Sequence, residues 1–302
     1  MELRGVLAPA TTPFDAVTGE VDVIALRANL RAWLREELAG AVLFGSTGEG
    51  ILLDEDERAR ALSAAREVME GDRLLLAGAG AESTRAAVRL ARAAARAGAD
   101  AVMVHPPAYY RPQMTPDALR DHYLAVADAS PVPVVLYAVP PRFSTVELPS
   151  GLVGELSHHP NVAGIKDSSG DLKTLATLAD ACDRSCAVLV GSGDSLYGAL
   201  EVGASGGILA VALLDPRSCA TAYRSYVDGD VARAGRMQER LTPLHRRVVG
   251  AHGVAGVKAG LDRLGLHGGP VRPPLKPLRS RAAEEVREAL AAAGLVAAGR
   301  ED

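Results

Sequence analysis

Short hydrophobic runs alternate with longer amphipathic segments along the first two thirds of the chain. The runs are continuous rather than alternating with polar residues, which is typical of parallel strands that helices cover. Eight runs occur, at residues 5–10, 40–46, 73–79, 100–106, 132–140, 162–167, 187–193 and 206–212. The pattern predicts an α/β fold built from eight strand–helix units.

The segments between the runs have the spacing and the end signals of helices. Residues 83–98 begin with Ser-Thr, place Ala, Leu and Val at helical spacing and end at Gly98. Residues 115–130 begin with Thr115 as a capping residue and Pro116 at the first helical position. Eight units of this length favour a (β/α)8 barrel, the TIM barrel, over an open doubly wound sheet.

After residue 215 the pattern becomes helical throughout. Helices are predicted at about 216–228, 230–250, 254–264 and 281–294, with the linker GGPVRPPLKP (268–277) before the last one. We expect residues 1–215 to form the barrel and residues 216–302 to pack on it as a C-terminal helical appendage, within one structural unit.

Composition and charge exclude several classes of protein. The 302 residues are 48% hydrophobic and 23% charged, as in an ordinary globular protein, and a net charge of −4 gives no reason to expect nucleic acid or an anionic membrane as a partner. No window is long enough to span a bilayer, and the N-terminus lacks a signal-peptide core. The three cysteines and seven histidines lack metal-ligand spacing. A cytoplasmic protein is expected.

In a (β/α)8 barrel, catalytic groups lie at the carboxyl ends of the strands. After the second run, the turn GSTGEG (45–50) places Ser46 and Thr47 where they could bind a carboxylate or a phosphate, although a tight turn capped by one hydroxyl would look the same. GSGDS (191–195) and SGGILA (205–210) would let a substrate approach the backbone, which leaves a phosphorylated substrate open.

Tyrosines stand at two further strand ends. Tyr109 and Tyr110 follow the fourth run in a proline-bounded loop, a setting also typical of packing or interface residues. Tyr137 lies in the fifth run, with Arg142 just past it. A tyrosine on a strand is more often part of the core, so Tyr137 is a catalytic candidate only if it faces the same mouth as the other strand-end residues.

Lys166 ends the sixth run, in VAGIKDSS. The chain has only three other lysines, Lys173, Lys258 and Lys276, while arginine supplies the remaining basic residues. Burial disfavours the charged form of an amine, and a neutral amine can attack a ketone to form an imine. The alternative is a surface lysine or one paired with the adjacent Asp167.

Taken together, these motifs resemble one known family. GSTGE, the YY pair, LYAVP, GIKDS and the GG pair before Ile208 occur in order across nearly the whole chain. The set resembles the pyruvate-dependent class I aldolases of the dihydrodipicolinate synthase/N-acetylneuraminate lyase family. The resemblance implies a carbon–carbon lyase that uses a lysine imine, binds a 2-oxo acid such as pyruvate together with an aldehyde, and needs no metal or diffusible cofactor.

The resemblance also implies roles for individual residues. Lys166 matches the lysine that forms the imine with pyruvate, and Tyr137 matches the tyrosine that shuttles protons. Ser46 and Thr47 match the hydroxyl pair that binds the pyruvate carboxylate, with Ser46 also joining the proton relay.

Two more matches concern the rim and the neighbouring subunit. Tyr109 matches a tyrosine that completes the relay of an adjacent subunit, which implies a homodimer or a homotetramer. Ile208 matches a residue near the bound pyruvate, and we place Gly207 with it as substrate-binding.

The substrate is less well defined than the reaction type. Stretches such as PAYYRPQM, GIKDSSGDL and GGPVRPPLKPL look most like 4-hydroxy-2-oxoglutarate aldolase, which releases pyruvate and glyoxylate. Arg142 instead matches the arginine with which dihydrodipicolinate synthases bind aspartate semialdehyde, although Phe143 and Ser144 depart from the synthase pattern. We favour the aldolase, with the synthase as the alternative and a non-catalytic 2-oxo acid-binding regulator as the alternative from another class.

Overall fold

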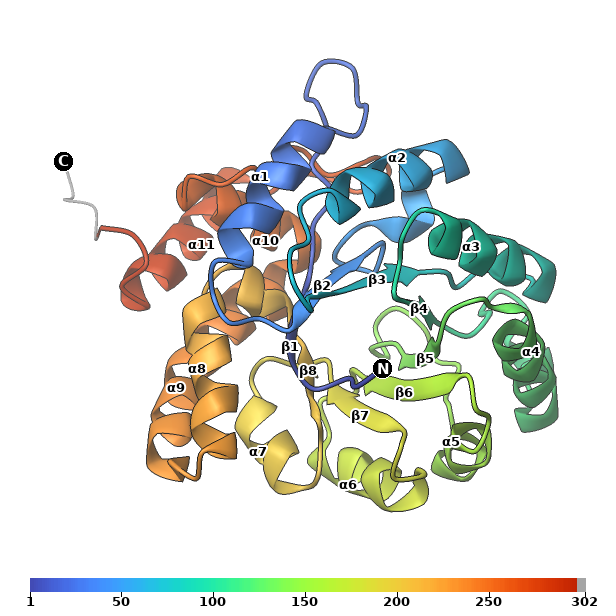
Figure 1. Ribbon diagram of the computed structural model, residues 1–302. Helices are drawn as coiled ribbons and strands as arrows, with labels where there is room; N and C mark the ends of the chain where they lie inside the picture. Colours follow the sequence, from blue (N-terminus) through green and yellow to red (C-terminus); the bar gives the residue numbers. More distant parts are fainter. Residues whose placement is uncertain (298–302) are drawn as a thin grey trace.

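Eight parallel strands close into a barrel in the computed structural model, which describes residues 1–297 (Figure 1). The strands follow one another around the ring in chain order, and β1 pairs with both β2 and β8. Their bounds are β1 Gly5–Pro9, β2 Gly40–Leu43, β3 Leu74–Gly78, β4 Ala101–Val104, β5 Val134–Ala138, β6 Val162–Asp167, β7 Ala187–Val190 and β8 Gly206–Ile208. Each strand lies within a predicted run, so the predicted TIM barrel is confirmed.

Eight helices form a ring outside the strands, as Figure 1 shows along the barrel axis. They are α1 Val23–Trp33, α2 Glu55–Arg66, α3 Thr84–Arg96, α4 Pro116–Ala129, α5 Ser150–Ser157, α6 Leu172–Ala181, α7 Leu196–Glu201 and α8 Pro216–Val227. Short 3-10 turns interrupt the connections at η1 Gly50–Leu52, η2 Arg111–Gln113 and η3 Ala210–Leu213. The predicted helix starts are confirmed, since the Ser83 and Thr115 side chains accept hydrogen bonds from the N–H groups of Ala86 and Ala118.

The chain continues beyond the barrel through α9 Val231–Leu244, the π-helical turn η4 His245–Gly250, α10 Ala251–Arg263 and α11 Ser280–Ala292. Helix α8 follows β8 and contacts β1, so it completes the eighth strand–helix unit. The helices outside the barrel therefore begin at α9 rather than directly after residue 215. The last five residues of the expected appendage, 298–302, lie outside the described part of the chain.

Two separate hydrophobic clusters explain why the strands are apolar on both faces. The outer cluster fills the space between strands and helices, and the inner cluster fills the barrel. Neighbouring strand residues point to opposite faces. Leu136 and Ile165 belong to the outer cluster, so the next residues, Tyr137 and Lys166, face the barrel interior.

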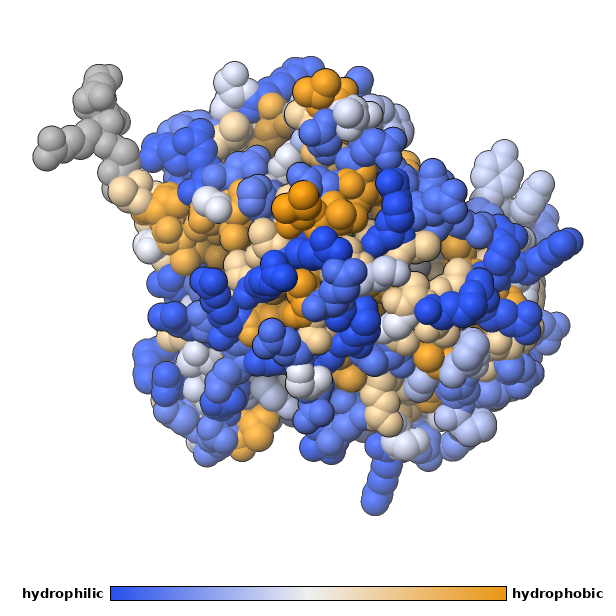
Figure 2. Space-filling view, turned by 45° about the horizontal axis from the view of Figure 1, so that its top comes forward, coloured by the Kyte–Doolittle hydropathy of each residue, from blue (hydrophilic) through white to orange (hydrophobic). Residues whose placement is uncertain are grey.

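The surface is mostly hydrophilic, with smaller hydrophobic patches between the polar residues on the face that Figure 2 displays. Within residues 1–297, no helix is both long and apolar enough to cross a membrane.

Candidate active site

Lys166 and Tyr137 lie side by side at the carboxyl ends of β6 and β5, where the strand register pairs them directly. Lys166 is 6% exposed and Tyr137 is 4% exposed. The Lys166 Nζ lies 4.4 Å from the centroid of the Tyr137 ring. The lysine is therefore buried at the barrel mouth against an aromatic ring, and the surface alternative for Lys166 is excluded.

Asp167 does not neutralise its neighbour, because the alternation of the strand turns its side chain the other way. Its Oδ1 accepts hydrogen bonds from the Ser169 N–H at 3.1 Å and from the Ser169 hydroxyl at 2.5 Å. Burial raises the pKa of Asp167, and the bonds from Ser169 oppose that shift. The Asp167 carboxylate is thus committed to its own loop rather than to the Lys166 amine.

Ser46 joins the pair from the turn after β2, which lies across the barrel mouth from β5 and β6. Its hydroxyl lies 3.4 Å from the Tyr137 hydroxyl, within hydrogen-bonding distance. Ser46 is exposed and Thr47 is half-buried, so both can be reached by a small molecule in the mouth. The tertiary structure therefore brings together three of the residues that the sequence singles out: Lys166, Tyr137 and Ser46.

The turn that carries Ser46 and Thr47 has an unusual backbone. Phe44 and Glu49 bracket it in the left-handed region, with φ of 60° and 53°. Non-glycine residues persist there only when the surrounding structure holds them, which is frequent at functional sites. The N–H groups of Gly48, Glu49 and Gly50 close the turn by donating to the Gly45 and Ser46 carbonyls. The N–H groups of Ser46 and Thr47 do not take part in the hydrogen bonds that close the turn.

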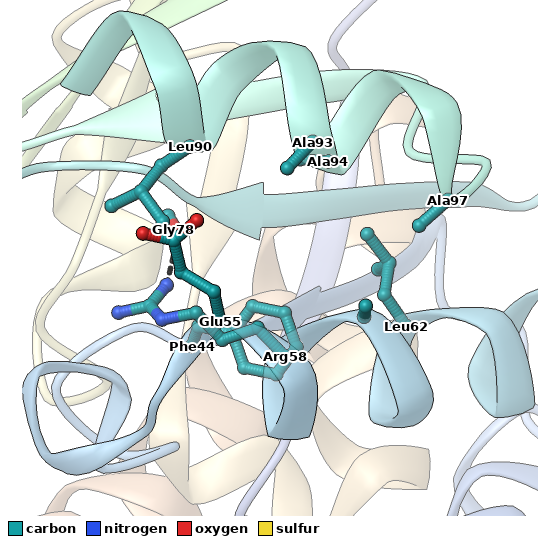
Figure 3. Close-up of a pocket in the computed structure, with 10 residues that line it drawn as sticks. Phe44, Glu55, Arg58, Leu62, Gly78, Leu90, Ala93, Ala94 and Ala97 are labelled. Atoms are coloured by element: carbon teal, nitrogen blue, oxygen red, sulfur yellow. Dashed lines mark hydrogen bonds between the residues drawn. The ribbon is translucent and has the colours of Figure 1, made fainter. Parts of the chain in front are cut away.

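Polar side chains hold this turn by donating hydrogen bonds to its backbone carbonyls. The Thr12 hydroxyl donates to the Gly48 carbonyl at 2.7 Å. Arg58, from α2, donates to the Gly50 carbonyl and, at 2.9 Å, to the Gly78 carbonyl at the end of β3. Figure 3 shows Arg58 beside the Phe44 ring, in a small pocket between α2 and α3. The turn is thereby tied to the segment that follows β1 and to the end of β3.

Tyr109 lies at the surface of the subunit, on the connection between β4 and α4. It is 80% exposed, its ring contacts that of Tyr110 edge-on, and Tyr110 is 66% exposed. The Glu82 carboxylate holds the loop in place by accepting the N–H groups of Ala108 and Tyr109 at 3.0 and 2.9 Å. The structure thus presents an ordered pair of aromatic rings to the outside of the subunit.

Arg142 lies on the loop after β5 and is exposed, so it is not the buried arginine that a closed carboxylate site would need. Its guanidinium lies over the Phe143 ring, 5.0 Å from the centroid. At the rim it can reach a second carboxylate only if the loop or the substrate brings the two together.

Ile208 and Gly207 face opposite sides of β8. Ile208 is fully buried in the inner cluster together with Tyr137. A Cβ added at Gly207 would lie 3.0 Å from the side chains of Val190 and Leu209, both in the outer cluster. Gly207 can therefore contribute to a site in the mouth only through its backbone.

One polar group at the mouth was missed in the sequence. The Ser192 hydroxyl donates to Asp194 at 2.7 Å and lies 3.3 Å from Nε2 of His245, while Arg246 donates to Asp194 at 2.9 Å. Burial lowers the pKa of His245, the Asp194 carboxylate opposes that shift, and the charge of Arg142 adds to it. In the sequence, the glycines of GSGDS indicate only close access to the backbone, and nothing in the local pattern links this segment to a histidine 53 residues downstream.

The barrel fold and the family that the sequence matches define a class of protein, the pyruvate-dependent class I lyases that act through a lysine Schiff base. The family model of the dihydrodipicolinate synthetase family matches residues 2–293. The chain therefore belongs to this family. Within residues 1–297, no group of three or more His, Cys, Asp or Glu side chains is arranged to hold a metal ion.

Relatives and solved structures agree with that assignment over almost the full length. The chain is 34% identical to the 4-hydroxy-tetrahydrodipicolinate synthase of Mesorhizobium japonicum, covering 97% of this chain and 99% of the relative. It is 35% identical to that of Methanoculleus marisnigri, covering 95% and 98%. A chloride-inhibited dihydrodipicolinate synthase from Acinetobacter baumannii, solved with pyruvate, superimposes with a TM-score of 0.92 at 30% identity, covering 98% of this chain and 100% of that one.

The same comparisons bear on the substrate. The relatives found are named as synthases, which supports the alternative better than the favoured 4-hydroxy-2-oxoglutarate aldolase. One similar structure, with a TM-score of 0.91 at 26% identity over 97% of this chain and 98% of that one, is described as the first monomeric dihydrodipicolinate synthase variant.

Proposed function

We propose that this chain is a 4-hydroxy-tetrahydrodipicolinate synthase that joins pyruvate to aspartate semialdehyde through an imine at Lys166. The observation that carries the proposal is the buried Lys166 amine beside Tyr137, whose hydroxyl reaches Ser46 at the same mouth. The names of the full-length relatives support the choice of substrate.

The first step is formation of the imine. The unprotonated Lys166 amine attacks the keto carbon of pyruvate, and loss of water leaves a carbon–nitrogen double bond. Two protons must reach the departing oxygen, and the Tyr137 hydroxyl is placed to pass them with Ser46 as its next partner. Ser46 and Thr47, on their strained turn, bind the pyruvate carboxylate and hold the keto carbon toward Lys166.

The second step uses the imine as an electron sink. Once protonated, the imine lets the methyl group of pyruvate lose a proton to give an enamine. The enamine carbon then attacks the aldehyde carbon of the second substrate, the aldehyde oxygen takes up a proton, and the imine to Lys166 forms again. The amino group that came with aspartate semialdehyde then attacks the imine carbon, which closes the ring and releases the Lys166 amine. Arg142, at the rim, supplies a guanidinium that could pair with the carboxylate of aspartate semialdehyde.

The proposal extends to a second subunit. Tyr109 and Tyr110 project from an ordered loop with most of their ring surface exposed, although aromatic rings of this size usually bury their surface. We place Tyr109 against the mouth of a partner subunit in a homodimer or homotetramer. Sedimentation of the purified protein, with and without the Tyr109→Ala substitution, tests this arrangement.

Reduction with borohydride in the presence of pyruvate tests the imine directly. We expect a stable pyruvate-derived mass increase at Lys166 and none in the Lys166→Arg variant, which keeps the charge but cannot form the imine. Folded wild-type protein that stays unmodified would contradict the proposal and favour a non-catalytic 2-oxo acid-binding protein.

Turnover then separates the two enzymes. The synthase reading predicts consumption of pyruvate that depends on aspartate semialdehyde. The second candidate, 4-hydroxy-2-oxoglutarate aldolase, retains support from the sequence resemblance, and it predicts pyruvate release from 4-hydroxy-2-oxoglutarate instead. Both reactions should be measured on one preparation, since whichever gives the higher kcat/KM identifies the substrate.

A further inference from the structure

A second lysine is buried even more deeply than Lys166, and the proposed mechanism does not use it. Lys258, in α10, is 1% exposed, and its Nζ lies 2.5 Å from Oε1 of Glu49. The Glu49 side chain is fully buried and makes this contact as an ion pair without good hydrogen-bond geometry at Oε1. Burial lowers the pKa of Lys258, and Glu49 opposes that shift.

Glu49 is part of the turn that carries the proposed carboxylate-binding hydroxyls. It is the left-handed residue that ends the turn, and its N–H donates to the carbonyl of Ser46 at 3.3 Å. The side chain of Glu49 contacts Lys258 in α10, one of the helices beyond the barrel. The ion pair therefore joins the end of the turn to a segment more than 200 residues later in the chain.

The linker after α10 holds the same carboxylate from its other side. The Arg272 N–H donates to Oε2 of Glu49 at 2.7 Å, and Lys258 also donates to the Pro270 carbonyl at 2.7 Å. The linker comes very close to α10, since a Cβ added at Gly268 would lie 2.0 Å from the Lys258 carbonyl oxygen. Both oxygens of Glu49 are thus occupied by groups from residues 258–272.

The Arg272 side chain extends the contact to α2. Its guanidinium donates to both oxygens of Glu57 at 2.6 Å, and it lies 4.2 Å from the centroid of the Phe14 ring. Glu57 is also the third residue of α2 and closes the capping box with Asp54. The chain from Glu49 to Glu57 is therefore held at both ends by the C-terminal part of the protein.

We infer that Lys258, through its buried ion pair with Glu49, is a positioning residue that sets the geometry of the Ser46–Thr47 turn for binding the carboxylate of pyruvate. The inference rests on the proposed function. Lys258 does not touch the substrate; it acts through Glu49, three residues from Ser46. The end of β2 holds the turn on one side, and the Lys258–Glu49 pair holds it on the other.

Stability is a poor explanation for this pair. Taking two charges out of water costs free energy that their attraction only partly returns, and well-packed hydrophobic replacements are often as stable or more so. A buried ion pair does, however, require one geometry, because a shifted charge is left unpaired in the interior. Since Glu49 has a strained φ, the pair is suited to holding a backbone that hydrophobic side chains would let relax.

The test replaces the charges without leaving either one unpaired. In the Glu49→Leu/Lys258→Met double variant, the pyruvate concentration that half-saturates borohydride trapping at Lys166 is measured alongside KM, kcat and urea unfolding. We expect the half-saturating concentration and KM to rise about tenfold or more, as small misplacements in a site do, with a smaller change in kcat. That split is expected when binding of the ground state and the transition state is weakened alike.

Two further proteins complete the experiment. Arg66→Met removes an ion pair with Asp100 at the opposite end of the barrel, and its half-saturating concentration should match wild type. Glu49→Gln keeps the side-chain volume and an acceptor for the Arg272 N–H, and should raise the half-saturating concentration severalfold even if the double variant fails to fold.

The inference is wrong if the folded double variant, or Glu49→Gln where the double variant does not fold, is half-saturated within twofold of the wild-type concentration. It is equally wrong if Arg66→Met weakens pyruvate binding as much as the double variant, because a general loss of barrel stability would then explain both. Failure of the proposed function looks different, since the wild-type protein itself would then give no adduct.

Discussion

Two lysines, Lys166 and Lys258, are both buried but have opposite surroundings. Lys166 is 6% exposed and faces the Tyr137 ring at the barrel mouth, while the adjacent Asp167 bonds to its own loop. Lys258 is 1% exposed, with a carboxylate on one side and a carbonyl on the other. Burial alone therefore does not make a lysine a nucleophile. A buried amine can attack a carbonyl carbon only if no carboxylate holds its proton.

The largest expected difference between the two lysines is in catalysis. Lys166→Met should lower kcat/KM at least about a thousandfold, because it removes the atom that bonds to pyruvate. Lys258→Met should still give the borohydride adduct at Lys166. Mass spectrometry of both variants after borohydride trapping with pyruvate shows which lysine forms the imine. An adduct at Lys258 in the wild type would show that Lys258, and not Lys166, is the nucleophile.

Stability should separate the same two variants in the opposite direction. Lys258→Met leaves Glu49 buried without its cation and should lower the free energy of unfolding by about 3–5 kcal/mol. Lys166→Met replaces a buried amine that has no carboxylate beside it, so it should be neutral or stabilising. Urea unfolding of both variants measures the difference. Equal destabilisation would show that the two environments are less distinct than their contacts suggest.

The partner of Lys166 gives the next effect in size. Tyr137→Phe keeps the ring beside the amine and removes only the hydroxyl 3.4 Å from Ser46. We expect kcat to fall about a hundredfold, the lower end of what a positioned proton-transfer group contributes. If the variant still forms the borohydride adduct but no longer turns over, Tyr137 acts in a step after imine formation. An unchanged kcat would show that Tyr137 is not part of the proton relay.

The smallest expected effect is on the pH dependence of the free energy of unfolding, through the ion pair between Arg272 and Glu57. The hydrogen bond from Arg272 is the largest cause that lowers the pKa of Glu57 from its usual value of 4.5, with burial opposing it. A lowered carboxylate pKa stabilises the fold above the unfolded-state pKa, and that stability is lost as pH falls through the folded-state pKa.

Arg272→Met should therefore lower the free energy of unfolding at pH 7 by about 1–3 kcal/mol and weaken its dependence on pH below about 4.5. Arg287→Met breaks the exposed pair with Glu284 and is the matched control, for which a smaller change is expected. Urea unfolding at pH 7 and at several values below pH 4.5 gives the comparison. Identical pH profiles for wild type and Arg272→Met would contradict it.

Much of the fold could be predicted from local pattern alone. Apolar runs and helix caps such as Thr115 are short-range features, and each predicted run contains a strand of the barrel. The position of Lys166 at a strand end could also be predicted locally, because only the hydrophobic run before it is required. The boundary of the helical tail was less well placed, since the role of α8 as a barrel helix depends on its packing against β1.

The sequence determined by itself the barrel, the strand-end lysine and the resemblance that indicates imine chemistry, because strand periodicity and motif order are properties of neighbouring residues. Only the tertiary structure decided which faces those residues present. It turned Tyr137 and Lys166 inward, Gly207 outward and Tyr109 to the surface. It also brought Lys258 to Glu49 and His245 to Ser192, contacts between residues far apart in the chain that no local pattern encodes.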